Sequence, residues 1–284
     1  MVAGLHFTKM QGIGNDYIYV NAFEEHVDDP GALSARISDR HFGVGADGLV
    51  LIGPSDAADF RMRMFNADGS EGDMCGNASR CIGKYVYDRG LTDKTRVTLE
   101  TRAGIKVLEL TVEGGQVRSV RVDMGAPRIN CEEVPCLLGT GVVRQAPVTV
   151  LGHTFRVTPV CTGNPHGVIL LDEPMEDFDL AKYGPALETH PAFPQKANIE
   201  FVNVLSEDRL RMRVWERGSG ITLACGTGSC AALVAAHLCG VCGRRATVVL
   251  DGGELVDEWD EATGHVFMTG PAAFVFDGEY DVRR

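Results

Sequence analysis

The stretch Phe65-Asn66-Ala67-Asp68-Gly69-Ser70-Glu71-Gly72-Asp73-Met74-Cys75-Gly76-Asn77 is partly repeated later in the chain. Trp215-Glu216 corresponds to the start of this stretch and Cys225-Gly226-Thr227 to its end. Both lie 150 residues later, since 216 − 66 = 150 and 225 − 75 = 150. Gly14-Asn15-Asp16-Tyr17 and Gly163-Asn164-Pro165-His166 form another pair, at 164 − 15 = 149. A long-period repeat with two copies predicts two related domains rather than a solenoid.

Each of the two cysteines precedes a predicted helix. From Gly76, apolar residues recur on one helical face until Arg89-Gly90, which supplies a cation and a C-cap glycine. The helix that starts at Gly226 is apolar nearly all round and should be buried. Two further helices are expected, one from Asp29-Pro30 to about Arg40 and one near Asp179 to Glu188.

Strands are predicted around both buried helices. In the first half they are 7–10, 17–20, 49–52, 60–65, 97–99, 105–112 and 117–124. In the second half they are 148–150, 154–157, 168–171, 199–204, 210–215, 246–250, 265–268 and 273–276. The fold class is therefore α+β, with many strands and one central helix in each half.

Composition excludes several classes of protein. A chain of 284 residues can hold two domains of about 140 residues. Its net charge of −12, without a basic cluster, argues against nucleic-acid or anionic-membrane binding. No apolar run approaches a membrane span, and Met1–His6 lacks the pattern of an export signal. An odd set of 9 cysteines fits free thiols in a reducing cytoplasm.

The paired cysteines indicate acid/base chemistry at one carbon. A thiol at a helix N-terminus has its pKa lowered from about 8.5, because the unpaired N–H groups favour the thiolate. The same N–H groups, at Gly76-Asn77 and Gly226-Thr227, can bind a carboxylate. If both helix starts face one cleft, one thiolate removes an α-proton and the other thiol delivers one to the opposite face, which inverts the centre.

Other side chains qualify as partners of these thiols. His166 and Glu216 are candidates for setting the protonation of the thiols, since His166 follows a turn and Glu216 ends a strand. Four asparagines can each donate and accept hydrogen bonds, which suits an ammonium-carboxylate substrate: Asn15, Asn66, Asn164 and Asn198. Cys81 and Cys230, on the helices behind, are interpreted as core residues.

No cofactor or metal site is predicted. His237-Leu238-Cys239-Gly240-Val241-Cys242 contains a Cys-x-x-Cys, but no second motif completes four zinc ligands. Gly43-Val44-Gly45-Ala46-Asp47-Gly48 follows a predicted helix, whereas a dinucleotide-binding loop opens one.

Taken in order, these motifs resemble the diaminopimelate epimerase family. The segments that carry the resemblance run from residue 7 to the C-terminal strand and include 7–16, 65–71, Met74-Cys75-Gly76-Asn77, Gly163-Asn164-Pro165-His166, Asn198-Ile199-Glu200-Phe201-Val202, Glu216-Arg217-Gly218 and Ala224-Cys225-Gly226-Thr227-Gly228. The resemblance implies interconversion of LL- and meso-2,6-diaminopimelate without pyridoxal phosphate or metal, on the route to lysine and peptidoglycan precursors, by a cytoplasmic homodimer.

The resemblance also implies an architecture. It predicts two pseudo-symmetric domains, each a strand-rich, barrel-like sheet around a central helix, with the active site between them. The first would comprise residues 1–125 with the C-terminal strand 271–284, and the second residues 126–270.

By the same resemblance, individual residues receive roles. Cys75 and Cys225 are the acid/base thiols, and His166 and Glu216 support them. The remaining positions would contact the substrate, with Arg217 on its distal carboxylate: Asn15, Asn66, Gly76, Asn77, Asn164, Asn198, Glu216, Gly226 and Thr227.

Four positions depart from the family pattern. Gly48 replaces a frequent Gln, Ala78 replaces a Gly, Ile221 replaces a Glu, and Phe276 replaces a tyrosine of some dimer interfaces. They leave open a related cofactor-independent amino-acid racemase with another substrate. A hydrolase that uses one cysteine with His166 is an alternative from another class, but it would not explain the duplication. A non-catalytic amino-acid-binding protein is a third reading.

Overall fold

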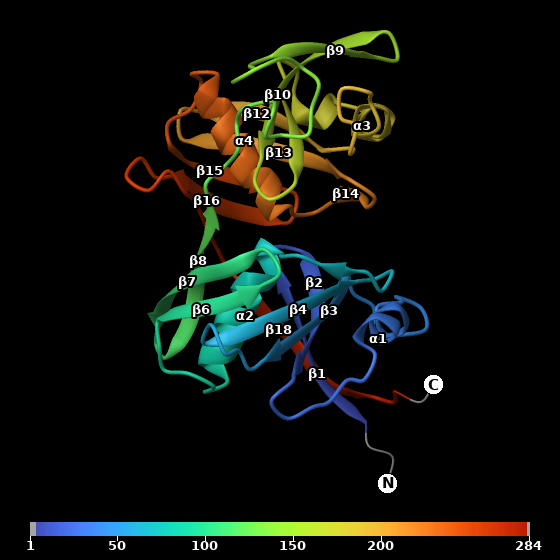
Figure 1. Cartoon of the computed structure of the whole chain (residues 1–284), viewed down its shortest axis with the longest axis vertical. Helices are drawn as coiled ribbons and strands as arrows, with labels where there is room; N and C mark the ends of the chain where they lie inside the picture. Colours follow the sequence, from blue (N-terminus) through green and yellow to red (C-terminus); the bar gives the residue numbers. More distant parts are fainter. Residues whose placement is uncertain (1–3, 283–284) are drawn as a thin grey trace. The chain divides into compact units, whose positions relative to one another are not determined.

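The computed structural model describes residues 4–282, which divide into two compact units (Figure 1). Unit 1 comprises residues 4–122 and 270–282 of this part, and unit 2 comprises residues 123–269. Each unit is rich in strands and contains one long helix among them, α2 (Gly76–Asp88) or α4 (Gly226–Leu238). The predicted α+β class is confirmed.

The remaining elements of unit 1 are one helix and nine strands among the described residues. They are α1 (Pro30–Ile37), β1 (Leu5–Gly12), β2 (Asn15–Asn21), β3 (Gly48–Gly53), β4 (Phe60–Asn66), β5 (Glu71–Gly72), β6 (Arg96–Thr101), β7 (Gly104–Glu113), β8 (Gln116–Gly125, which runs to the boundary with unit 2) and β18 (Ala273–Tyr280).

Unit 2 contains the rest of the chain's secondary structure. Its elements are β9 (Ala146–Val150), β10 (His153–Cys161), β11 (Pro165–Leu170), the 3-10 turn η1 (Met175–Asp177), α3 (Leu180–Glu188), β12 (Asn198–Ser206), β13 (Arg209–Glu216), β14 (Gly220–Thr222), β15 (Arg245–Leu250), β16 (Gly253–Trp259) and β17 (Val266–Gly270).

The two units follow one plan of strand pairing. In unit 1, β2 pairs with β3 and β4 with β6 in parallel, whereas β1–β2, β3–β4, β4–β5, β6–β7 and β7–β8 are antiparallel. In unit 2, β11–β12 and β13–β15 are parallel, and β10–β11, β12–β13, β13–β14, β15–β16 and β16–β17 are antiparallel. The sequence repeat is therefore also a structural repeat.

The pairing register fixes which residues are equivalent between the units. Tyr17 lies opposite Gly48 in unit 1, as His166 lies opposite Asn198 in unit 2. Two residues further along the same strand pair, Val50 of β3 corresponds to Glu200 of β12. Unit 2 thus carries His166, Asn198 and Glu200 where unit 1 carries Tyr17, Gly48 and Val50.

The C-terminal strand completes unit 1. β18 pairs antiparallel with β1, and β9 pairs in the same way with β10 in unit 2. The strand pattern grouped 273–276 with the second half of the chain, whereas β18 belongs to unit 1, the half to which the family resemblance assigned 271–284. Alternation identifies a strand but does not specify the strand with which it pairs.

Two other sequence expectations need correction. Helix α1 begins at the expected N-cap, Asp29, but ends at Ile37 rather than near Arg40. The carboxylate of Asp39 accepts hydrogen bonds from the N–H groups of residues 41 and 42, at 2.7 Å each, and this local turn replaces a further helical turn. Strand β16 was not predicted, because its acidic residues, among them the fully buried Asp257, interrupt the apolar alternation.

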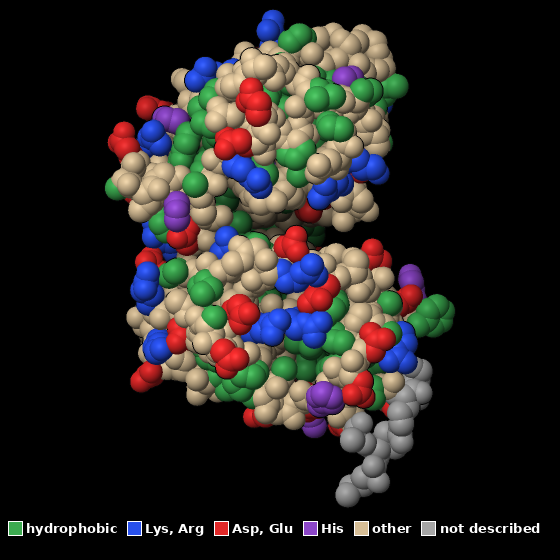
Figure 2. Space-filling model, in the orientation of Figure 1, with side chains coloured by type: hydrophobic (Ala, Val, Ile, Leu, Met, Phe, Trp, Pro, Cys, Tyr) green, Lys and Arg blue, Asp and Glu red, His purple; other side chains and the backbone are tan. Residues whose placement is uncertain are grey.

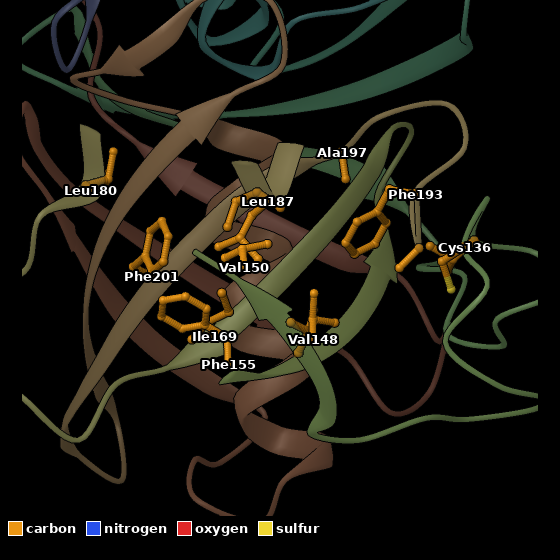
Figure 3. Packing of buried hydrophobic residues seen from close by; sticks show 14 of the residues in the cluster. Cys136, Val148, Val150, Phe155, Ile169, Leu180, Leu187, Phe193, Ala197 and Phe201 are labelled. Carbon is orange, nitrogen blue, oxygen red and sulfur yellow. The ribbon is translucent and has the colours of Figure 1, made fainter. Parts of the chain in front are cut away.

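Separate hydrophobic clusters fill the units. The cluster in unit 2 includes Phe155 and Phe201, whose ring centroids lie 6.2 Å apart, and Ile169 and Leu187 pack with them (Figure 3). A cluster in unit 1 joins β1, β2 and β3 to α1 through Phe7, Ile18, Leu49 and Leu33. Cys81 and Cys230 are fully buried, so the prediction that they are core residues is confirmed.

The surface carries mixed charge. On the face shown in Figure 2, Lys and Arg side chains are interspersed with Asp and Glu, in keeping with the net charge of −12. Ion pairs such as Arg63–Glu71, at 2.8 Å, account for part of this pattern. Among the described residues, no helix is long and apolar enough to cross a membrane.

Candidate active site

Cys75 caps the central helix of unit 1. Its backbone is extended, with φ −134° and ψ 123°, and its Sγ accepts a hydrogen bond from Ala78 N–H at 3.4 Å. The thiol is half-buried, and its Sγ lies 3.6 Å from Asn15 Oδ1, to which the S–H donates. The expected cysteine at a helix N-terminus is confirmed, and Asn15 is brought into contact with it.

A charged network holds Asn15 in place. Its Nδ2 donates to Asp47 Oδ2 at 2.7 Å, which directs Oδ1 toward the Cys75 thiol. Arg40 bridges Asp47 and Asp16 at 3.0 and 2.9 Å. Burial and the neighbouring Asp16 raise the pKa of Asp47. Asp47 and Arg40 were not predicted as site residues. Asp47 lies in a Gly-rich turn, and nothing in that turn indicates that its carboxylate orients Asn15.

The other expected residues of unit 1 lie at the first positions of α2 and at the end of β4. Gly76 and Asn77 are buried at the first positions of α2. Asn66 ends β4, is half-buried, and its Nδ2 donates to Ser70 Oγ at 3.0 Å. The N–H groups of the first turn of α2 are thus close to the thiol, so an anion bound by them would lie beside Cys75.

Cys225 has the same backbone role in unit 2. It caps α4 with φ −126° and ψ 108°, and its Sγ accepts from Gly228 N–H at 3.3 Å. Thr227 Oγ1 lies 3.5 Å from this sulfur, and Asn198 Nδ2 lies 4.0 Å from it. Unlike Cys75, Cys225 is only 5% exposed.

The electrostatics of Cys225 differ from the sequence expectation. Burial raises the pKa of the Cys225 thiol well above its usual value, and the nearby Glu216 and Glu200 carboxylates raise it further. Hydrogen bonds from Thr227 and from Gly228 N–H act in the opposite direction but are outweighed. The prediction of a lowered pKa was therefore wrong for Cys225, because desolvation disfavours the thiolate more than the helix terminus favours it.

This difference predicts unequal thiol reactivity. In the ligand-free protein at pH 7.5, iodoacetamide should alkylate the half-buried Cys75 at least about tenfold faster than Cys225, since only an accessible thiolate reacts. Alkylation of Cys225 should still be accelerating at pH values above about 9, because its raised pKa delays thiolate formation. A time course of peptide masses measures both rates. Equal rates at the two cysteines would contradict this description.

His166 lies in a buried acid–base pair. Its Nδ1 lies 2.7 Å from Glu200 Oε1, within hydrogen-bond distance, and both side chains are 0% exposed. Its Nε2 lies 2.9 Å from Asn164 Oδ1. The structure therefore brings His166 and Asn164 together as expected, and it adds Glu200. Glu200 was not predicted, because it stands within an apolar run that is typical of a buried strand.

The remaining expected residues lie at the end of β13, in the loop that follows it, and at the first positions of α4, Gly226 and Thr227. Arg217 N–H donates to Asn198 Oδ1 at 2.8 Å, and Arg217 Nη1 donates to Gln195 O at 3.0 Å. Glu216 is half-buried and accepts a hydrogen bond from Thr222 Oγ1. The backbone of Thr227 accepts from Thr162 Oγ1 at 2.9 Å. The Arg217 side chain is exposed, so its guanidinium can reach a ligand.

The four positions that depart from the family pattern lie in different environments. A Cβ at Gly48 would lie 2.1 Å from the Phe65 carbonyl oxygen, so this backbone has no room for a side chain there. Ala78 is fully buried. Ile221 and Phe276 are 43% and 47% exposed, and the Phe276 ring meets Phe7 edge-on at 5.9 Å.

The Cys-x-x-Cys segment lies at the end of α4, whose C-cap is Cys239. His237 Nδ1 lies 3.1 Å from the Cys242 carbonyl oxygen, just after α4. Within residues 4–282, no three His, Cys, Asp or Glu side chains converge in a group that could hold a metal ion.

Comparison with known proteins places the chain in a family. Residues 7–130 and 158–275 match the family model described as diaminopimelate epimerase. A protein named diaminopimelate epimerase from Acetivibrio thermocellus is 56% identical over 98% of this chain and 99% of its own length. Proteins of the same name from Methanococcus maripaludis and Desulfovibrio desulfuricans are each 54% identical, over 98% and 99% of this chain and 100% and 99% of their own.

More distant solved structures share the fold. A hydroxyproline epimerase from Agrobacterium vitis superposes with a TM-score of 0.71 at 16% identity, covering 99% of this chain and 93% of that one. A phenazine biosynthesis protein of the PhzF family from Bacillus anthracis gives a TM-score of 0.69 at 18% identity, covering 97% and 98%. At these identities the likeness concerns the fold alone.

Proposed function

Because the chain belongs to the diaminopimelate epimerase family, we propose that it interconverts LL- and meso-2,6-diaminopimelate by proton transfer between two cysteines and the α-carbon. The shared name of its relatives makes it an isomerase. The observation that supports the mechanism is the pair of equivalent helix caps, since Cys75 and Cys225 accept hydrogen bonds from the third N–H of α2 and α4. A reaction that inverts one carbon uses one proton carrier on each face.

The two thiols account for both proton transfers of the reaction. A thiolate takes the α-proton, and the electron pair that formed the C–H bond remains on the carbon, delocalised into the carboxylate. The other thiol gives its proton to the opposite face and becomes the thiolate. The raised pKa keeps Cys225 protonated, which suits it to donate when the α-proton of the bound epimer faces Cys75. The reverse reaction exchanges the roles.

The helix termini supply the electrostatic part of the mechanism. Backbone N–H groups at Gly76-Asn77 and Gly226-Thr227 would hold the carboxylate of the reacting end, where negative charge grows as the carbanion forms. These groups are already fixed by the helices, so little reorganisation opposes the reaction. The mechanism requires each half of the chain to present its thiol to the same α-carbon.

Polar side chains would bind the rest of the substrate. Arg217 is assigned to the distal carboxylate, because its exposed guanidinium offers paired donors for that group. Glu216 and four asparagines would bind the ammonium groups and carboxylates: Asn15, Asn66, Asn164 and Asn198. Neutral amides can both donate and accept, so they tolerate a zwitterion without adding net charge.

The direct test is turnover of the named substrate. The purified chain is incubated with LL-diaminopimelate, and separately with proline, hydroxyproline and glutamate, and the stereoisomers are separated by chiral chromatography. We expect formation of the meso isomer from LL-diaminopimelate and no racemisation of the other amino acids. Racemisation of another amino acid without turnover of diaminopimelate would favour the related-racemase alternative. Release of a hydrolysed product would favour the thiol hydrolase.

We further propose a cytoplasmic homodimer. The free cysteines suit a reducing compartment. Strand β18 leaves Val275 and Phe276 55% and 47% exposed, and pairing with a second copy would cover them. Sedimentation equilibrium should give about 61 kDa, twice the 30.6 kDa of the chain. Phe276→Glu should shift the protein toward the monomer, and a wild-type protein that sediments as a monomer at micromolar concentration would contradict the proposal.

A further inference from the structure

A buried carboxylate beneath the unit 2 half-site has no assigned role. Glu200 lies on β12 between Ile199 and Phe201, and all three side chains are 0% exposed. Its Oε1 lies 2.7 Å from His166 Nδ1, while Oε2 has no hydrogen-bond partner within residues 4–282. Burying an ionic pair rarely adds stability over well-packed apolar residues, and a half-satisfied carboxylate adds less. A structural role is therefore a poor explanation of Glu200.

A comparison of the two halves of the repeat shows how Glu200 differs from its equivalent in unit 1. Val50 holds the equivalent position in unit 1, and Tyr17 holds that of His166. The fold thus accommodates an apolar side chain at this point of the sheet, since Val50 is fully buried. The acid–base pair is present only in the half that carries Cys225.

Because residue 228 is a glycine, the Glu200 carboxylate can lie close to the first turn of α4. A Cβ at Gly228 would lie 2.8 Å from Glu200 Oε1 and 3.1 Å from Cys225 Sγ. The carboxylate and the thiol therefore approach the same glycine at the first turn of α4. The equivalent residue of unit 1, Ala78, carries a Cβ, and no carboxylate occupies the corresponding strand position there.

We propose that Glu200 is a positioning residue of the epimerisation, which accepts a hydrogen bond from His166 Nδ1–H and so fixes the imidazole with Nε2 toward Asn164. A carboxylate on one imidazole nitrogen fixes the orientation of the ring, and the Nε2 contact with Asn164 Oδ1 is a hydrogen bond when Nε2 also carries a proton. The contacts then run from Glu200 through His166 to Asn164, which is assigned to the substrate. This inference rests on the proposed function.

Two substitutions separate the contribution of the charge of Glu200 from that of its hydrogen-bond acceptor. Glu200→Gln keeps the shape and an oxygen acceptor but removes the charge, and Glu200→Val copies unit 1 and removes the acceptor. We expect kcat for diaminopimelate to fall on the order of 10²-fold in E200V and by a smaller factor in E200Q, with KM within about threefold of the wild type. A kcat loss without a KM change indicates a misplaced reacting group rather than lost binding.

A matched control is Asp257→Asn. Asp257 is another fully buried carboxylate of unit 2, on β16, and its Oδ1 lies 4.0 Å from Cys230 Sγ. D257N should keep kcat within about threefold even if its melting temperature falls as far as that of E200V. If the kcat of E200V is also within threefold, or if E200V and D257N lose kcat in proportion to their melting temperatures, Glu200 is structural and the proposal is overturned.

A spectroscopic readout does not depend on activity. In protein labelled with ¹⁵N-histidine, His166 should show a protonated Nδ1 with a slowly exchanging proton, assigned by its absence in His166→Gln. The signal should shift in E200Q and disappear in E200V. An unprotonated Nδ1 in the wild type overturns the proposal even if neither variant folds. If diaminopimelate is not turned over at all, the proposed function fails, and these spectra still decide the Glu200–His166 pair.

Discussion

Replacing Cys225 with alanine should lower kcat for LL-diaminopimelate by about 10³-fold or more, and replacing Cys75 should do the same. Each thiol serves one face of the α-carbon, so neither can substitute for the other. The binding groups around each helix start remain in place, and KM should therefore change much less than kcat. The measurement is the initial rate of stereoisomer formation over a range of substrate concentrations, in both reaction directions.

Cys230→Ala and Cys81→Ala serve as controls for these variants. Both residues are fully buried cysteines on the same two helices, away from the caps, so their loss creates a small cavity and reduces stability without removing a proton carrier. A fall in kcat of Cys225→Ala no larger than that of Cys230→Ala would contradict the assignment. A hydrolase would depend on one cysteine only, whereas the two-thiol mechanism depends on both.

The second large effect is expected for Gly228→Ala. The added methyl carbon would lie 2.8 Å from Glu200 Oε1 and 3.1 Å from Cys225 Sγ, so the carboxylate and the thiol must move apart. We expect kcat to fall on the order of 10²-fold, because displacing a reacting group by about 1 Å has effects of this size. Overpacking should also reduce stability by about 1–3 kcal/mol.

Gly83→Ala is the comparison for this substitution. Gly83 lies within α2, and an added Cβ there would lie 2.9 Å from Leu110 Cδ2 and 3.2 Å from Val120 Cγ1. G83A should therefore lose comparable stability, measured by thermal unfolding, while keeping most of its activity. If G228A and G83A lose stability and activity to the same extent, the close approach at Gly228 has no specific catalytic importance.

Local sequence signals predicted the parts of the structure that depend on neighbouring residues. The helix that starts after Cys75 was predicted from its apolar spacing and from Arg89-Gly90, and α2 is capped at those residues. The helix after Cys225 was predicted from its apolar composition, and it is buried along most of its length. The 150-residue offset predicted two related halves because a duplicated fold preserves its spacing.

Properties that depend on distant residues were not predictable in this way. The partner of β18 is β1, at the opposite end of the chain. The pKa of Cys225 is set by burial and by two carboxylates on β12 and β13, none of which is visible in the cysteine motif. Glu200 and Asp47 were missed for the same reason, since each acts on a side chain that is remote in sequence, His166 or Asn15.

The central claim is that two different thiols serve the two faces of one carbon, and isotope transfer in heavy water tests it most directly. LL-diaminopimelate is incubated with the protein in D₂O, and product and remaining substrate are separated early in the reaction. Two separate thiols predict one deuterium at the inverted α-carbon of every meso product molecule, while recovered LL-diaminopimelate keeps its α-proton. Product that retains the original α-proton, or substrate that gains deuterium as fast as product forms, would indicate a single base and contradict the account.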